Sequence, residues 1–232
     1  MSTLAEFEVR HTRAVAPVRR VALGDSDLPF DPAPGHGGLL LAGVVGASVP
    51  RFAEEVRDDL DRLVRDLEMG ERIPQPRMRF RFQTDVVGLD RSRHRLLQVG
   101  TALGFEYDDH GAPLPQALAA VYAAGALTGQ RRLVVFRMIR RATRWEGGAD
   151  DSLITFLRSD EATYLRRDRH RDEHWAMQLL GFGGESEPAR GEILGRFREL
   201  VREAHPDHGG ETGLAGDRIT DLTVAKRILL AS

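Results

Sequence analysis

Two amphipathic segments near the end of the chain, separated by a short polar stretch, constrain the fold more than any other feature of the sequence. Apolar residues recur every three or four positions over 193–201, as on one face of an α-helix, and Pro206 cannot continue that helix. A second apolar stripe covers 219–229 with the same spacing. The pattern predicts an antiparallel helical hairpin with His205-Pro206-Asp207 at the start of its connecting loop, and a short first helix over 174–180 that packs against it.

This region resembles a J domain, the module of the DnaJ (Hsp40) family. The resemblance rests on the run Leu-Leu-Gly-Phe at 179–182, on Phe197, on the tripeptide His205-Pro206-Asp207 and on the apolar stripe of the last predicted helix. It covers residues 173–232, about a quarter of the chain, and the run His-Pro-Asp-His-Gly-Gly is most similar to the HPD-x-GG subtype of import motors. The fold it implies is all-α, an antiparallel hairpin plus a short first helix.

The resemblance implies a co-chaperone. J domains bind a DnaK-type Hsp70 chaperone and stimulate its ATPase, which is allosteric activation of a partner and not an enzymatic activity of their own. The rest of the chain would then serve as a targeting or client adaptor. By position, the resemblance implies chaperone contacts for His205, Pro206, Asp207, Arg198 and Arg202. It implies a hydrophobic core of Leu179, Leu180, Ile193, Phe197, Leu200, Ile219, Leu222, Ala225 and Leu229.

The chain departs from the family in its charge. Family members carry several basic residues in the first turn of the second helix, where this chain has Leu194 and Gly195, and residues 174–232 hold seven basic and nine acidic side chains. We therefore expect docking that is weaker than that of a strongly basic J domain, or tuned to a particular partner. The chain also lacks the Gly/Phe linker and the cysteine-rich zinc region of general DnaJ chaperones, which favours a specialised recruiter.

The front of the chain reads as an α+β region of unknown function. An irregular, proline-rich arm is predicted over 1–36, an α/β domain over 37–148, and a charged helical connector over 149–172 that leads into the J domain at 173–232. The predicted strands lie at 19–23, 37–49, 77–82 and 132–140, and the predicted helices at 50–70, 89–103 and 114–124.

An alternative function rests on acidic residues in this region. Asp85, Asp90, Asp108 and Asp109 could together bind magnesium. The predicted order of a strand, a helix and then Gly-Phe-x-x-Asp-Asp resembles RusA-type Holliday junction resolvases, although the paired acids before the helix and the adjacent asparagine of those enzymes are not clear in this chain. Two groups of arginines could bind phosphates. They are Arg77, Arg79 and Arg81, and Arg137, Arg140, Arg141 and Arg144. The alternative is a nucleic-acid-binding or magnesium-dependent nuclease with a degenerate J-like tail.

Composition removes several other classes of protein. The chain has no cysteine, which excludes disulfides, thiolate metal sites and cysteine nucleophiles, and we expect neither a metal nor a cofactor. It also has no asparagine, so an esterase interpretation of Gly24-Asp25-Ser26 lacks its oxyanion-hole residue. The formal net charge of −2 and the lack of a long apolar segment predict a cytoplasmic protein without membrane binding, in which nucleic-acid binding is a minor expectation.

Overall fold

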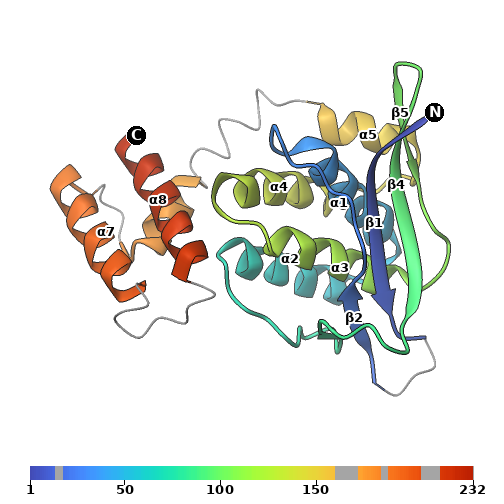
Figure 1. The fold of residues 1–232 in the computed structure, drawn as a ribbon, viewed down its shortest axis with the longest axis horizontal. Helices are drawn as coiled ribbons and strands as arrows, with labels where there is room; N and C mark the ends of the chain where they lie inside the picture. The colour runs from blue at the N-terminus through green and yellow to red at the C-terminus, as the bar shows by residue number, and fades with distance from the viewer. Residues whose placement is uncertain (14–17, 160–171, 184–187, 205–214, 232) are drawn as a thin grey trace. The chain divides into compact units, whose positions relative to one another are not determined.

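The protein is α+β and divides into two compact units. The computed structural model describes residues 1–13, 18–159, 172–183, 188–204 and 215–231. The first unit comprises Met1–Leu127 and Val134–Ser159, and the second comprises Thr128–Leu133 and Asp160–Ser232. A mixed sheet with helices forms the first unit, and the described residues of the second are helical or irregular (Figure 1). No helix in the described part of the chain is long and apolar enough to cross a bilayer.

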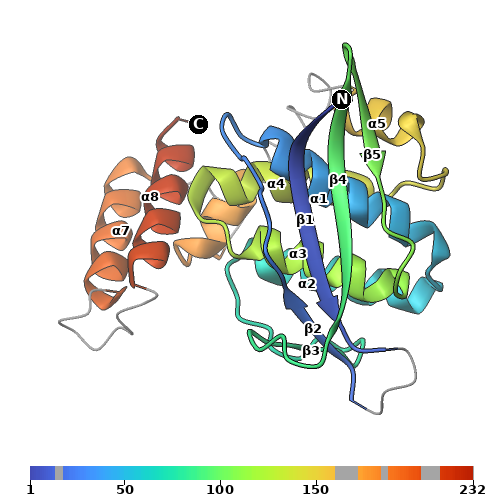
Figure 2. The ribbon, with the colours of Figure 1, turned by 45° about the vertical axis from the view of Figure 1, so that its right-hand side comes forward.

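A five-stranded sheet with the order β3-β2-β1-β4-β5 organises the first unit. The central strand is β1 (Ser2–His11), which pairs antiparallel with β2 (Arg20–Leu23) on one side and with β4 (Asp90–Val99) on the other. The short strand β3 (Arg81–Phe82) adds to β2 in parallel, and β5 (Ala102–Glu106) forms a hairpin with β4. Figure 2 shows the sheet with the helices behind it.

Period-2 alternation along β1 and β4 produces one apolar face and one charged face, because successive side chains of a strand point to opposite sides. On the outward face Glu8 is in register with Arg93, and Glu6 is in register with Arg95. Opposite charges directly across a strand pair support this register. The inward side chains, all buried, are Ala5, Phe7, Val9, Ser92, His94 and Leu96.

Helices cover the inward face of the sheet. The helices α1 (Gly35–Ser48) and α3 (Pro113–Gly125) contact the central strands directly. The helix α2 (Glu54–Glu68) packs on α3, and α5 (Asp151–Arg158) packs on α1 and β5. A 3-10 turn, η1 (Val49–Arg51), joins α1 to α2, and α4 (Gly129–Ala142) follows α3.

The central helix α1 is buried on nearly every side, and its glycines make this possible. A Cβ at Gly43 would lie 2.4 Å from the Phe105 ring, and a Cβ at Gly46 would lie 2.8 Å from the Leu153 side chain. The carbonyl of Gly43 also accepts a hydrogen bond of 3.1 Å from the Tyr107 hydroxyl. Side chains of the sheet and of α5 therefore lie directly against the backbone of α1.

Four secondary-structure predictions for the first unit are wrong. The irregular arm over 1–36 contains β1, the central strand, as well as β2. The strand predicted over 37–49 is α1, because a helix buried on all sides has no amphipathic period and resembles a buried strand in sequence. The helix predicted over 89–103 is β4 with the start of β5, and the strand predicted over 132–140 lies in α4.

Other predictions for this unit are confirmed. The amphipathic stripe predicted from residue 50 onward forms α2, with Leu60, Leu63, Val64 and Leu67 buried. The helix predicted at 114–124 is α3, and the strand at 19–23 is β2. Along 77–82 the arginines are exposed while Met78 and Phe80 are buried, although only Arg81–Phe82 is a strand. In the predicted connector, α5 is helical, and residues 160–171 lie outside the described residues.

Candidate functional site

A helical hairpin dominates the described residues of the second unit. It consists of α7 (Arg190–Ala204) and α8 (Ala215–Ala231), which lie side by side (Figures 1 and 2). Residues 172–179 form a further helical segment ahead of it. Among the expected core residues, those that are buried are Leu179, Leu180, Ile193, Leu222 and Ala225. Those that are half-buried are Phe197, Leu200, Ile219 and Leu229.

The run Leu-Leu-Gly-Phe at 179–182 ends the first helical segment. Gly181 has a φ of +75°, a left-handed conformation that glycine adopts at little cost. The N–H of Phe182 donates to the carbonyl of Met177 at 2.8 Å, and the N–H of Gly181 donates to Gln178 at 3.0 Å. These two bonds define a Schellman motif, which satisfies carbonyls that the end of a helix would otherwise leave unpaired.

Side-chain contacts fix α7 against its neighbours. The Arg196 guanidinium donates to the carbonyl of Leu180 at 3.1 Å and pairs with Glu199 at 3.0 Å, so that α7 holds the end of the first helical segment. Across the hairpin, the Lys226 ammonium lies 4.1 Å from the centroid of the Phe197 ring. A cation–π contact of this kind contributes about 0.5–1 kcal/mol at a partly exposed site.

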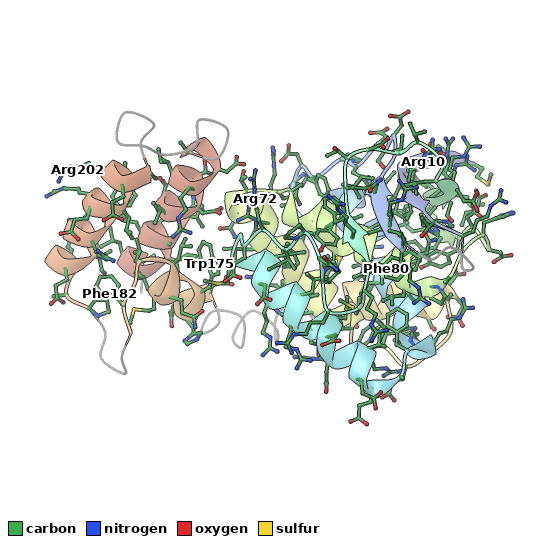
Figure 3. All side chains as sticks on the ribbon, turned by 90° about the horizontal axis from the view of Figure 1, so that it is seen from below. Arg10, Arg72, Phe80, Trp175, Phe182 and Arg202 are labelled. Atoms are coloured by element: carbon green, nitrogen blue, oxygen red, sulfur yellow. The ribbon has the colours of Figure 1, made fainter. Side chains whose placement is uncertain are left out.

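The two arginines expected to contact a chaperone are exposed on α7. Arg198 and Arg202 lie one helical turn apart, and Figure 3 shows Arg202 on the outer side of α7, pointing away from α8. Glu199 and Glu203 are exposed on the same helix, so the surface of α7 carries both signs of charge. The tripeptide His205-Pro206-Asp207 directly follows Ala204, the last residue of α7, and lies outside the described residues.

The four acids of the nuclease alternative do not form one cluster. Asp85 is exposed and accepts a hydrogen bond from the N–H of Val87, whereas Asp90 pairs with Arg13 at 3.1 Å. Asp108 accepts backbone N–H groups of Arg93 and His110 at 2.9 and 2.8 Å. Within the described ranges, no group of three or more His, Asp or Glu side chains is placed to hold a metal ion.

The arginines expected to bind phosphate are also dispersed. Arg140 and Arg141 are buried in the first unit, where Arg140 pairs with Glu68 and Arg141 donates to the carbonyl of Leu157 at 3.3 Å. Arg141 also lies 5.0 Å from the centroid of the Phe156 ring. Arg140 and Arg141 therefore take part in packing inside the first unit and are not exposed to bind phosphate.

A buried polar network between β1, β4 and α3 was missed by the sequence analysis. His11, Ser92, His94 and Gln116 are each at most 5% exposed. The Ser92 Oγ lies 2.8 Å from His11 Nε2, accepts from Gln116 Nε2 at 3.0 Å and donates to the carbonyl of His110 at 2.5 Å. Because it is buried and already donates its proton to a carbonyl, Ser92 is a structural group and not a nucleophile. The alternating run Arg-Ser-Arg-His-Arg-Leu at 91–96 was the signal that could have placed it on a strand.

The same network determines the protonation state of His94. Gln116 donates through its amide nitrogen to Ser92, so its Oε1 accepts from His94 Nε2 at 3.0 Å. The other ring nitrogen, Nδ1, accepts the backbone N–H of Asp108 at 3.3 Å, so this ring is neutral. Burial lowers the pKa of His94 below its ordinary value of 6.5, although the bond to Gln116 opposes that shift.

On the outward face of the sheet, Glu8 is surrounded by arginines. Arg10 lies 2.7 Å and Arg93 lies 2.8 Å from its carboxylate, and Arg91 lies 3.9 Å away. Burial alone would raise the pKa of Glu8, but the hydrogen bonds from Arg93 and Arg10 outweigh it and leave this pKa below its ordinary value of 4.5. The pKa of Asp108 also lies below its ordinary value of 3.8. Burial alone would raise this pKa, but the hydrogen bonds from the backbone N–H groups of His110 and Arg93 lower it further than burial raises it.

These shifts predict that acid destabilises the first unit in two stages. Between the folded pKa of His94 and its unfolded value near 6.5, only the unfolded chain takes up the proton, so stability is full above pH 6.5 and falls as the pH drops below it. Glu8 and Asp108 add a second loss as the pH falls below their ordinary values of 4.5 and 3.8. Urea midpoints measured by circular dichroism between pH 8 and pH 3 test this. In a His94→Gln variant, the loss of stability below pH 6.5 should be absent, and the second loss at lower pH should remain. A wild-type midpoint that is constant from pH 8 to pH 5 would contradict the prediction.

Comparison with known proteins identifies no relative. A scan against protein-family models finds no match, and neither a search of curated proteins nor a search of solved structures finds one.

Proposed function

We propose that the second unit acts as a J domain that recruits a DnaK-type Hsp70 chaperone and stimulates its ATPase, with the first unit as a targeting or client adaptor. The observation that supports this most is the hairpin of α7 and α8, since the segment that joins the two helices begins with His205-Pro206-Asp207. A first helical segment ahead of the hairpin, closed by the glycine of Leu-Leu-Gly-Phe at 179–182, adds to this support.

The proposed mechanism is allosteric. The second unit would bind the hydrolysis-competent state of the chaperone more tightly than its resting state, because a ligand shifts an equilibrium only by its difference in affinity for the two states. Lowering the hydrolysis barrier by about 1.4 kcal/mol is enough for a tenfold faster rate. His205, Pro206 and Asp207 would supply the differential contact. Arg198 and Arg202, exposed on α7, would orient the encounter with an acidic surface.

Steady-state ATP hydrolysis by a DnaK-type chaperone tests the proposal. Adding the wild-type chain should raise the turnover severalfold, and adding His205→Gln should leave it at the basal rate. A flat response to both proteins would overturn the proposed function.

A charge reversal on α7 should weaken the stimulation without abolishing it. In the Arg198→Glu variant, the concentration needed for half-maximal stimulation should rise about 3- to 10-fold, because an exposed charge at an interface mainly affects association. The effect should shrink at high salt, where exposed charges are screened. Arg218→Glu, at an exposed position in the first turn of α8, is the matched control. Equal effects of both variants would count against a docking role for Arg198.

A further inference from the structure

A pocket of about 830 Å³ opens in the first unit, at the end of the sheet where β1 ends and β4 begins. Its walls are formed by the last residue of β1 and the two residues after it, by the first residues of β4, and by the segment that leads into α3 with the first turn of that helix, together with Arg19 and Phe80. This volume lies within the range of about 300–1,000 Å³ that is typical of small-molecule sites.

The pocket combines an apolar wall with a basic rim. Phe80, Leu114 and Pro115 provide the apolar wall, and Phe80 is only 6% exposed. Among the described residues of the lining are three arginines and one carboxylate, that of Asp90, and Arg13 already pairs with this carboxylate. Because the lining holds more positive than negative side chains, the pocket favours an anion.

Arg19 is the basic group best placed for a ligand. It is exposed, and its guanidinium carbon lies 5.8 Å from the centroid of the Phe80 ring. In the part of the chain that the structure describes, no carboxylate pairs with Arg19. An arginine of this kind binds carboxylate or phosphate through two parallel hydrogen bonds, while the neighbouring ring accepts an apolar or aromatic group.

The polar network behind the pocket fixes its shape. His11 belongs to the lining and is held from behind by Ser92, which in turn is held by Gln116. Gly111 lines the same wall with a φ of +89°, and a Cβ there would lie 2.5 Å from the His11 ring. A wall built from buried, hydrogen-bonded side chains is preorganised, which lowers the entropic cost of binding.

We propose that this pocket binds a small organic anion whose carboxylate or phosphate pairs with Arg19 and whose apolar or aromatic body lies against Phe80, Leu114 and Pro115. The site belongs to the first unit alone and does not depend on the proposed chaperone function. It gives the first unit a ligand-binding role of its own.

Titration of the full chain by ¹H–¹⁵N correlation spectroscopy tests this proposal with three probes: phenyl phosphate, 3-phenylpropionate and the neutral 3-phenylpropanol. Saturable shifts of the amides of Gly111, Ala112 and Leu114 with an anion, and not with the alcohol, are expected. Binding of only one of the two anions supports the proposal and identifies the anionic group. Shifts that do not saturate, or equal shifts with the alcohol, would overturn it.

Two variants of the pocket and one control outside it distinguish a loss of ligand binding from a loss of folding. Arg19→Ala should lower the affinity for the anion about 10-fold, as expected for the loss of a charge-assisted pair. Arg51→Ala, at an exposed arginine outside the pocket, should leave this affinity unchanged. Ala112→Asp should weaken binding, because it adds a negative charge to the lining. It should keep or raise the melting temperature, because Ala112 is the N-cap of α3 without a side-chain cap, and aspartate is a favourable N-cap residue. Unchanged affinity in both Arg19→Ala and Ala112→Asp would contradict the assignment.

Discussion

The Gly43→Val variant should have a first unit that is less stable by about 3 kcal/mol, toward the upper end of the cost of overpacking a protein core. The reason is geometric: a Cβ at this position of α1 would lie 2.4 Å from the Phe105 ring, and the two methyl groups of valine need further space. Phe105 itself packs against Tyr107, with ring centroids 5.3 Å apart, so it cannot move without disturbing a second ring. A loss of this size is a large share of the roughly 5–15 kcal/mol that stabilises a typical domain.

Urea denaturation of Gly43→Val measures this loss, and Gly104→Val is its matched control. A Cβ at Gly104, the neighbour of Phe105 in β5, meets no atom within 4 Å, so valine there should be neutral or mildly stabilising. Adding Phe105→Ala to Gly43→Val should restore part of the lost stability, since it removes the obstructing ring. Equal midpoints for Gly43→Val and Gly104→Val would show that α1 does not pack as described.

The Leu222→Ala variant should lose about 2–5 kcal/mol from the second unit. Leu222 is fully buried in α8, and truncating a buried leucine removes apolar contact and leaves a cavity. A single core in a unit of this size supplies on the order of 3–5 kcal/mol, so the substitution removes most of the stability of the hairpin. Helical content and ATPase stimulation should fall together.

Thermal unfolding by circular dichroism checks the Leu222 prediction. Thr223→Ala is the control, because Thr223 is the exposed neighbour on the same helix and its hydroxyl donates to the carbonyl of Ile219, one turn earlier in the helix, at 2.8 Å. The control should melt at or above the wild-type temperature, since alanine favours helix more than threonine does. A Leu222→Ala protein that melts with the control would contradict the described core.

Helices and strands are predicted well from the sequence where one face is exposed to solvent and the other is buried. The helix α2 is amphipathic, so the spacing of Leu60, Leu63 and Leu67 revealed it. The helix α1 is buried on nearly every side and carries no such period, so its apolar run favoured a strand. Apolar and charged residues alternate along β1 from Ala5 to Arg10, as expected for a strand. The prolines that follow led to the prediction of an irregular arm over the whole region.

For the candidate sites, features formed by a local stretch of sequence could be predicted, and features formed by distant segments could not. The run Leu-Leu-Gly-Phe at 179–182 could be placed at the end of a helix from sequence, because it is a local motif. The Schellman cap at Gly181 is the backbone geometry that ends this helix in the structure. The pocket and the network of His11, Ser92 and Gln116 could not, because they join strands and a helix that are far apart along the chain. Only the register of β1 on β4 brings His11 and Ser92 together.

Single-turnover hydrolysis of a preformed complex between a DnaK-type chaperone and ATP tests the central claim most directly, since it isolates the hydrolysis step from nucleotide exchange. The proposed J-domain activity predicts that the wild-type chain accelerates this step roughly 10-fold or more, a lowering of the barrier by about 1.4 kcal/mol, and that His205→Gln does not. An unchanged rate with the wild-type chain, or the same acceleration with His205→Gln, would contradict it.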